Sequence, residues 1–175
     1  RSGRALVFPV YWGTFERGGK PPDRNRTPLE LGELIARDFK DLARTIDYLE
    51  TRPDVDATRL GFYGLSLGAN FGQIFGALEP RLRVAILVSY SPLRGRPSYD
   101  WFNFAPRMKT PTLVLNGRYY EPCPGPCVER MLAFFGASPD DKRLVLADSG
   151  YIAPLDSLAV GEIGGWLDRY LGPTR

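Results

Sequence analysis

Short runs of continuous apolar residues constrain the fold of this chain more than any other feature. Such runs occupy residues 5–10, 84–88, 112–115 and 144–146, and residues 59–63 are predicted as a further short buried strand. A run that is apolar throughout predicts a strand covered on both faces. Stretches of helical length separate these runs, and this alternation is typical of a parallel sheet. We therefore expect an α/β protein with a mostly parallel, doubly wound sheet of about five strands and helices on both faces.

The longest predicted helix has a recognisable beginning and end. It starts at Thr27-Pro28-Leu29-Glu30, where threonine caps the helix, proline occupies the first turn and glutamate completes a capping box. Apolar side chains recur every three or four residues along it, so one face is expected to lie in the core. Pro53 ends it. Further helices are predicted over residues 69–78, 127–135 and 157–170.

Length and composition indicate one globular domain over residues 1–175. The chain is 43% hydrophobic and 25% charged, as in an ordinary soluble protein. Its net charge of +3 comes from basic residues scattered over loops, which predicts no nucleic-acid partner. No apolar run approaches the roughly 18 residues of a membrane span, and no leader pattern is present. We expect a cytoplasmic protein without a membrane partner.

The sequence Gly64-Leu65-Ser66-Leu67-Gly68 lies between a predicted strand and a predicted helix. G-x-S-x-G in that setting predicts the nucleophile elbow of a serine hydrolase, with Ser66 as the nucleophile and the Leu67 backbone N–H as an oxyanion donor. The alternative is a turn of small residues that happens to contain serine. We expect the tight turn to require both Gly64 and Gly68.

The chain contains no histidine. A serine hydroxyl is a weak nucleophile until a neighbouring group takes its proton, and imidazole does this best near neutral pH. The ordinary route to an activated Ser66 is therefore closed.

The elbow and the alternation of strands and helices resemble the α/β-hydrolase fold, in its dienelactone-hydrolase or prolyl-oligopeptidase-like branch. Residues 8–17, 47–53, 103–107 and 167–173 also resemble the hydrolase-like domains attached to bacterial serine/threonine protein kinases. The resemblance covers essentially the whole chain, and it implies a carboxylic ester hydrolase ancestry.

The resemblance also places the partners of the nucleophile. In that family the acid ends a Gly-Arg-Tyr-Asp pattern and the histidine ends an Asp-x-Gly-His pattern, whereas this chain has Tyr120 at the acid position and Tyr151 at the base position. Glu121 is a candidate substitute acid. A phenol titrates near pH 10 and donates a hydrogen bond at neutral pH, so Tyr151 cannot simply replace imidazole.

A further implication of the resemblance is that the strand expected beside residues 59–63, with its oxyanion loop, is missing. Residues 5–10 could then pair directly with 59–63, or another polypeptide could fill the gap, because buried backbone groups need partners. We expect direct pairing, a second chain or a homo-oligomer.

Residues 90–107 form an unusually long loop, which could be a lid over a cleft or could simply pack on the domain. Nearby aromatic residues are predicted to line a pocket for a small ester-like or apolar ligand: Tyr11, Trp12, Tyr99, Trp101 and Phe102.

Cys123 and Cys127 are expected to be free loop thiols, with a small-ring disulfide as the alternative. Without histidine, two cysteines cannot complete a structural zinc site, so we predict no metal and no cofactor.

Three functions follow from these residues. The first is a hydrolase-fold protein with impaired catalysis, in the manner of a pseudoenzyme. The second is an active serine esterase with unusual partners or completed by a second chain. The third is a scaffold or interaction domain, natural or engineered.

Overall fold

The computed structural model describes residues 3–18, 27–151 and 157–173. The elements follow one another as α1 (Pro28–Glu50), β1 (Leu60–Leu65), α2 (Leu67–Leu78), β2 (Leu82–Val88), α3 (Trp101–Phe104), β3 (Thr112–Gly117), α4 (Gly125–Ala133), β4 (Lys142–Ala147) and α5 (Ser157–Leu171). Short 3-10 turns lie at Phe15–Arg17, Ala105–Arg107 and Pro139–Asp141. At the start of α1, Thr27 and Glu30 form both hydrogen bonds of the predicted capping box.

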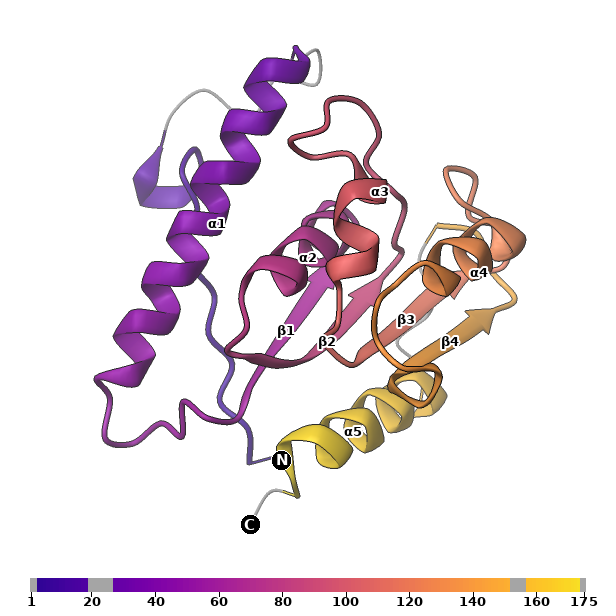
Figure 1. Ribbon diagram of the computed structural model, residues 1–175. Helices are drawn as coiled ribbons and strands as arrows, with labels where there is room; N and C mark the ends of the chain where they lie inside the picture. Colours follow the sequence, from indigo (N-terminus) through magenta and orange to yellow (C-terminus); the bar gives the residue numbers. More distant parts are fainter. Residues whose placement is uncertain (1–2, 19–26, 152–156, 174–175) are drawn as a thin grey trace.

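The four strands form one parallel sheet in the order β1-β2-β3-β4. Helices α2, α3 and α4 lie on one face with α1 beyond α2, and α5 covers the other face (Figure 1). The predicted α/β class is confirmed. Because all strands are parallel, their carboxyl ends meet at one edge of the sheet, which is where the elbow and the loops after β2, β3 and β4 come together.

Residues 5–10 are not a strand, so the described residues form four strands rather than about five. The segment has no regular secondary structure, and Leu6 and Phe8 are 72% and 79% exposed. Its start is held by Arg4, which bonds to the Asp168 carboxylate and to the Gly172 carbonyl. An apolar run becomes a strand only if a neighbouring backbone hydrogen-bonds to it, and among the described residues no segment does so here.

Direct pairing of residues 5–10 with β1, one of the three arrangements left open, is therefore wrong. Within the described residues β1 pairs with β2 only, which leaves its other edge open. Tyr63 and Leu65 on this strand are 44% and 45% exposed.

Residues 90–107, expected as one long loop, contain helix α3 and the 3-10 turn Ala105–Arg107, and the segment is anchored in the domain. Tyr90 and Trp101 are buried, and the buried Gln73 side chain links them by donating to the Trp101 carbonyl and accepting from the Tyr90 hydroxyl, both at 2.8 Å. The buried Asn116 side chain bonds to both backbone groups of Tyr90. These contacts favour a packed loop over a freely moving lid.

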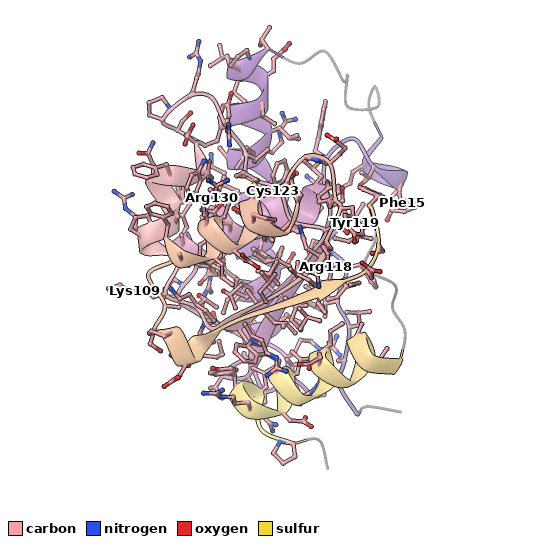
Figure 2. The ribbon with its side chains drawn as sticks, turned by 90° about the vertical axis from the view of Figure 1, so that its right-hand side faces the viewer. Phe15, Lys109, Arg118, Tyr119, Cys123 and Arg130 are labelled. Atoms are coloured by element: carbon pink, nitrogen blue, oxygen red, sulfur yellow. A yellow bond between two sulfur atoms is a disulfide. The ribbon has the colours of Figure 1, made fainter. Side chains whose placement is uncertain are left out.

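Cys123 and Cys127 form a disulfide, so the expectation of two free thiols is wrong. The intervening Pro-Gly-Pro turn and the start of α4 bring the two Cα atoms to 5.1 Å, within the range that a disulfide spans. Cys123, Arg118 and Tyr119 lie on the same side of the molecule (Figure 2), where the Gly125 N–H donates to the Arg118 carbonyl at 3.0 Å. Sequence spacing alone does not fix this three-dimensional separation.

Candidate active site

Ser66 occupies the sharp turn between β1 and α2. Its φ of 53° and ψ of −114° lie outside the regions that residues other than glycine favour, as expected for a strained nucleophile elbow. The turn is fixed on both sides, because the Ser66 N–H donates to the Val88 carbonyl at 2.8 Å and the Ser66 carbonyl accepts from Asn70 N–H at 3.0 Å. Leu67 is the first residue of α2, where helix geometry leaves the backbone N–H without an intrahelical acceptor.

The two glycines of the elbow are not equivalent. A Cβ on Gly64 would lie 2.4 Å from the Gly68 carbonyl oxygen, so no side chain fits there. A Cβ on Gly68 would meet nothing within 4 Å. The tight turn therefore requires Gly64, and the expectation that it also requires Gly68 is wrong.

Tyr151, for which the resemblance predicts the base position, contacts Ser66 directly. The Tyr151 hydroxyl donates a hydrogen bond to Ser66 Oγ at 2.7 Å. Tyr151 is 53% exposed, so this hydrogen bond lies at the protein surface, beside the carboxyl ends of the strands. A phenol in this position occupies a lone pair of the serine oxygen and takes no proton from it.

Tyr120 and Glu121 are adjacent in sequence but differ in their surroundings. Tyr120 is buried, and its ring packs against the Tyr151 ring with the centroids 5.4 Å apart. Glu121 is exposed and makes no hydrogen bond or ion pair with the part of the chain that the structure describes. Tyr120 therefore contacts Tyr151, and Tyr151 contacts Ser66, whereas Glu121 takes no part in these contacts.

Ser89 is a site residue that sequence reasoning missed. It follows β2, has a φ of 53° like Ser66, and its hydroxyl donates to the Tyr151 carbonyl at 2.6 Å. Tyr151 is therefore held at two points, by its backbone on Ser89 and by its phenol on Ser66. The sequence feature that could have indicated Ser89 is its place directly after a buried strand, and this strand is the neighbour of β1.

The aromatic residues expected to form a pocket do not gather beside Ser66. Trp12 lies under the Arg37 guanidinium, 4.3 Å from the ring centroid. Tyr99 is buried against α1 and α2, whereas Trp101 and Phe102 form an aromatic cluster with Phe134. These residues occupy three separate surroundings.

Tyr11 lies near the acidic side of α1. Burial, with smaller contributions from the Asp38 and Asp41 carboxylates, raises the pKa of Tyr11 to about 12.

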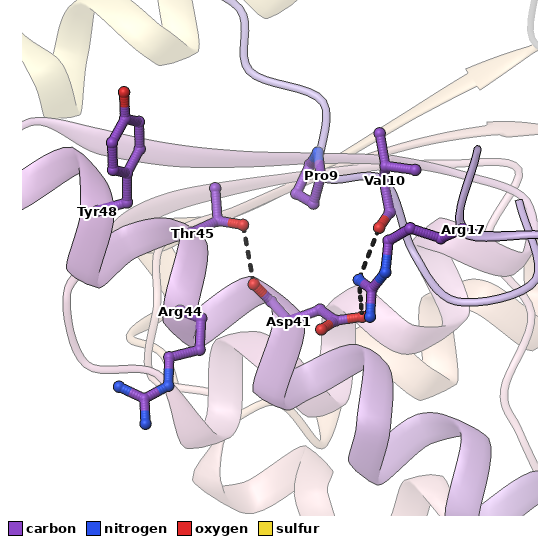
Figure 3. Close-up of a pocket in the computed structure, with 7 residues that line it drawn as sticks. All are labelled: Pro9, Val10, Arg17, Asp41, Arg44, Thr45 and Tyr48. Carbon is purple, nitrogen blue, oxygen red and sulfur yellow. Dashed lines mark hydrogen bonds and ion pairs between the residues drawn. The ribbon is translucent and has the colours of Figure 1, made fainter. Parts of the chain in front are cut away.

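A surface hollow of about 300 Å³ lies between the N-terminal segment and α1 (Figure 3). Its lining residues are Pro9, Val10, Arg17, Asp41, Arg44, Thr45 and Tyr48. Arg17 bridges the Val10 carbonyl and the Asp41 carboxylate, so its charge is already neutralised. No residue of the elbow lines this hollow.

The described residues contain no group of three or more histidine, cysteine, aspartate or glutamate side chains placed to hold a metal ion. Within the same part of the chain, no helix has the length and apolar character that crossing a membrane requires.

Comparison with known proteins identifies the fold. No protein-family model matches the chain, and no curated protein matches it in sequence. Solved structures do match: a cold-adapted esterase from an Arctic intertidal metagenomic library has a TM-score of 0.68 at 22% identity, with 81% of this chain and 62% of the esterase covered. An acetyl xylan esterase from Paenibacillus sp. R4 has a TM-score of 0.69 at 19% identity, with 93% and 64% covered. TT1662 from Thermus thermophilus has a TM-score of 0.68 at 19% identity, with 90% and 73% covered.

These identities are low, so the likeness establishes the fold alone. The chain has the α/β-hydrolase fold over the part that it spans, and its structural neighbours include esterases. It spans about three fifths of the length of the Arctic esterase. The resemblance to kinase-attached domains stays a prediction.

Proposed function

We propose that this chain is a serine-hydrolase-type domain, of carboxylic ester hydrolase ancestry, whose nucleophile is held in an impaired state. The observation that carries the proposal is the 2.7 Å hydrogen bond from the Tyr151 hydroxyl to Ser66 Oγ. An active serine hydrolase needs a proton acceptor at that place, and at neutral pH a phenol is a donor. The strained elbow supports the ancestry, because backbone strain of this kind persists where a nucleophile is presented.

The size of the impairment follows from what a base contributes. Loss of the general base in a serine hydrolase lowers the rate by about 10⁴- to 10⁶-fold, and loss of one oxyanion donor costs about a further 10²- to 10³-fold. The Leu67 N–H is the one donor that we assign here. We therefore expect ester turnover by the unmodified chain to be close to the background rate.

Restoring the acid and the base tests the proposal. The double variant Tyr151→His with Tyr120→Asp should hydrolyse p-nitrophenyl acetate at least about a hundredfold faster than the unmodified chain, because a positioned base contributes that much or more. The imidazole would replace the phenol beside Ser66, and the carboxylate would replace the ring packed against it.

A matched control uses a neighbouring tyrosine. Tyr119 is exposed, and its hydroxyl interacts with Asp148 rather than with Ser66. Tyr119→His should give no gain, and Ser66→Ala should abolish the gain of the double variant. Rapid stoichiometric labelling of Ser66 by a fluorophosphonate in the unmodified chain would contradict the impairment and favour an active esterase. A folded double variant without any gain would favour the scaffold function instead.

The substrate class of the ancestral site is a small carboxylic ester. Tyr151 and Leu67 are both exposed beside Ser66. The Ser66 hydroxyl therefore lies near the protein surface, where a small ester-like or apolar ligand can reach it. Titrating such an ester against the unmodified chain by NMR should shift signals of residues 65–68 and 151. Shifts confined to other regions would contradict this site.

We further propose that the open edge of β1 pairs with a strand from a second polypeptide. Tyr63 and Leu65 are half exposed on this edge strand, and unpaired strand edges readily accept another strand. The beginning of the segment 5–10 lies close to the beginning of β1, because the Gly172 carbonyl accepts hydrogen bonds from both Arg4 and Arg59. Mass measurement in solution distinguishes a separate partner chain from a homo-oligomer.

A further inference from the structure

The Cys123–Cys127 disulfide lies beside the loop that carries Tyr120 and closes onto the first turn of α4. The Cys123 side chain is fully buried, whereas Cys127 is only partly buried. A reductant in solution therefore reaches the bond from the side of Cys127.

A short series of contacts joins this disulfide to Ser66. The Cys123 N–H donates to the Tyr120 carbonyl at 3.0 Å, which closes the turn between them. The buried Asn116 amide also donates to the Cys123 carbonyl at 3.4 Å. The Tyr120 ring packs on the Tyr151 ring, and the Tyr151 hydroxyl bonds to Ser66 Oγ.

The two loops that carry these tyrosines are also tied to each other. The Tyr119 N–H donates to the Ser149 carbonyl at 3.0 Å, and the Arg118 N–H donates to the Ala147 carbonyl at 2.8 Å. A Cβ on Gly117 would lie 1.7 Å from the Gly150 carbonyl oxygen, so the loops are in close backbone contact. A change in the first loop is therefore passed to the loop that ends at Tyr151.

We propose that the Cys123–Cys127 disulfide is a reducible clamp on the serine site. When closed, it fixes the turn that positions Tyr120, and through the Tyr120 ring it holds the Tyr151 phenol on Ser66. When opened by reduction, it releases this turn and weakens the hydrogen bond to Ser66. Tyr120 acts here as a positioning residue, because it touches Tyr151 and not the serine.

The opening step requires a dithiol as reductant. Its thiolate attacks Cys127 Sγ, the sulfur–sulfur bond breaks, and the electron pair goes to Cys123 Sγ, which takes up a proton. The second thiol of the reductant then displaces Cys127, which leaves as a thiol while the dithiol becomes a disulfide. Two electrons pass to the protein. Closing reverses this exchange with a small-molecule disulfide as oxidant: the Cys127 thiolate, which the backbone N–H groups in the first turn of α4 favour, attacks one sulfur of that disulfide and releases one thiol. The Cys123 thiolate then attacks Cys127 Sγ, the protein disulfide forms again, and the second thiol leaves.

The test measures how fast a fluorophosphonate labels Ser66 in the oxidised chain and in the chain reduced by dithiothreitol. The phenol in the closed form occupies a serine lone pair, so we expect labelling to accelerate at least about threefold on reduction and to return on reoxidation. The Tyr151→Phe variant lacks the phenol, so it should label at one rate in both redox states. Equal labelling of the oxidised and reduced chain, or the same acceleration in Tyr151→Phe, would overturn the proposal.

Hydrogen exchange gives a second measurement that does not depend on labelling. Amides of residues 117–121, 123 and 149–151 should exchange at least about tenfold faster in the reduced chain, while those of β2 should not change. The Cys123→Ser, Cys127→Ser double variant should behave like the reduced chain with or without dithiothreitol. Faster exchange in β2 as well would mean general destabilisation and would refute a local clamp. The ratio between redox states is informative even if Ser66 labels rapidly, so this proposal and the impaired site can fail separately.

Discussion

The elbow provides a stability prediction with a built-in comparison, because its two glycines have opposite surroundings. In Gly64→Ala the new Cβ would lie 2.4 Å from the Gly68 carbonyl oxygen and 2.8 Å from the Ala69 nitrogen. Both are backbone atoms at the start of α2, so no side-chain rotation relieves the contact. The strand end or the helix start must move, and overpacking of this kind costs about 3 kcal/mol.

In Gly68→Ala the added methyl group has open space, and alanine is the better helix former by about 1 kcal/mol. For a chain of this length, about 3 kcal/mol lowers the midpoint of thermal unfolding by about 6–12 °C. Differential scanning calorimetry of the two variants should show a large decrease for Gly64→Ala and no decrease for Gly68→Ala. Equal midpoints for the two variants would refute the assignment of Gly64 as the residue that the turn requires.

Two further predictions concern the partly exposed Arg81, which pairs with Glu79, Asp47 and Glu50, and the sheet edge. The Arg81 guanidinium donates to the buried Glu79 carboxylate at 2.7 Å and holds the pKa of this carboxyl below its usual value of 4.5. The pair therefore stabilises the folded state above that pH, and this stabilisation is lost as the pH falls through the lowered pKa. Urea unfolding at several pH values should show Arg81→Met to be destabilising at pH 7 and progressively less so below about pH 4, whereas a pH-independent difference would speak against this pair. Tyr63→Lys places a charge on the open edge of β1 and should abolish any strand partner or oligomer seen by mass measurement, while Arg143→Ala on β4 should leave it intact.

Features that depend on local sequence were predictable. The capping box at Thr27 and Glu30 needs only residues three apart, and α1 begins where it predicts. The elbow likewise combines a strand, five residues and a helix that are continuous in sequence, and the structure places Ser66 at that turn. The neighbourhood of Ser66 and Tyr151 was predicted from the resemblance to the α/β-hydrolase family, and the two residues are in contact although they are 85 positions apart.

Features that depend on a distant partner were not predictable. Residues 5–10 have strand composition, but a strand also needs a neighbouring backbone, and composition does not report whether one is present. The disulfide depends on the separation of two Cα atoms across a proline-rich turn. The contact of Ser89 with the Tyr151 carbonyl involves a hydroxyl whose direction only the folded backbone sets.

The backbone attachment of position 151 to Ser89 has an evolutionary consequence. Because the Ser89 hydroxyl holds the main-chain carbonyl of Tyr151, one of the contacts that place this residue does not depend on the side chain that it carries. Substitution at position 151 can thus alter the chemistry of the elbow while the scaffold keeps its shape. A lineage with this arrangement could lose turnover in one mutational step and regain it later by reversal, without passing through a misfolded intermediate.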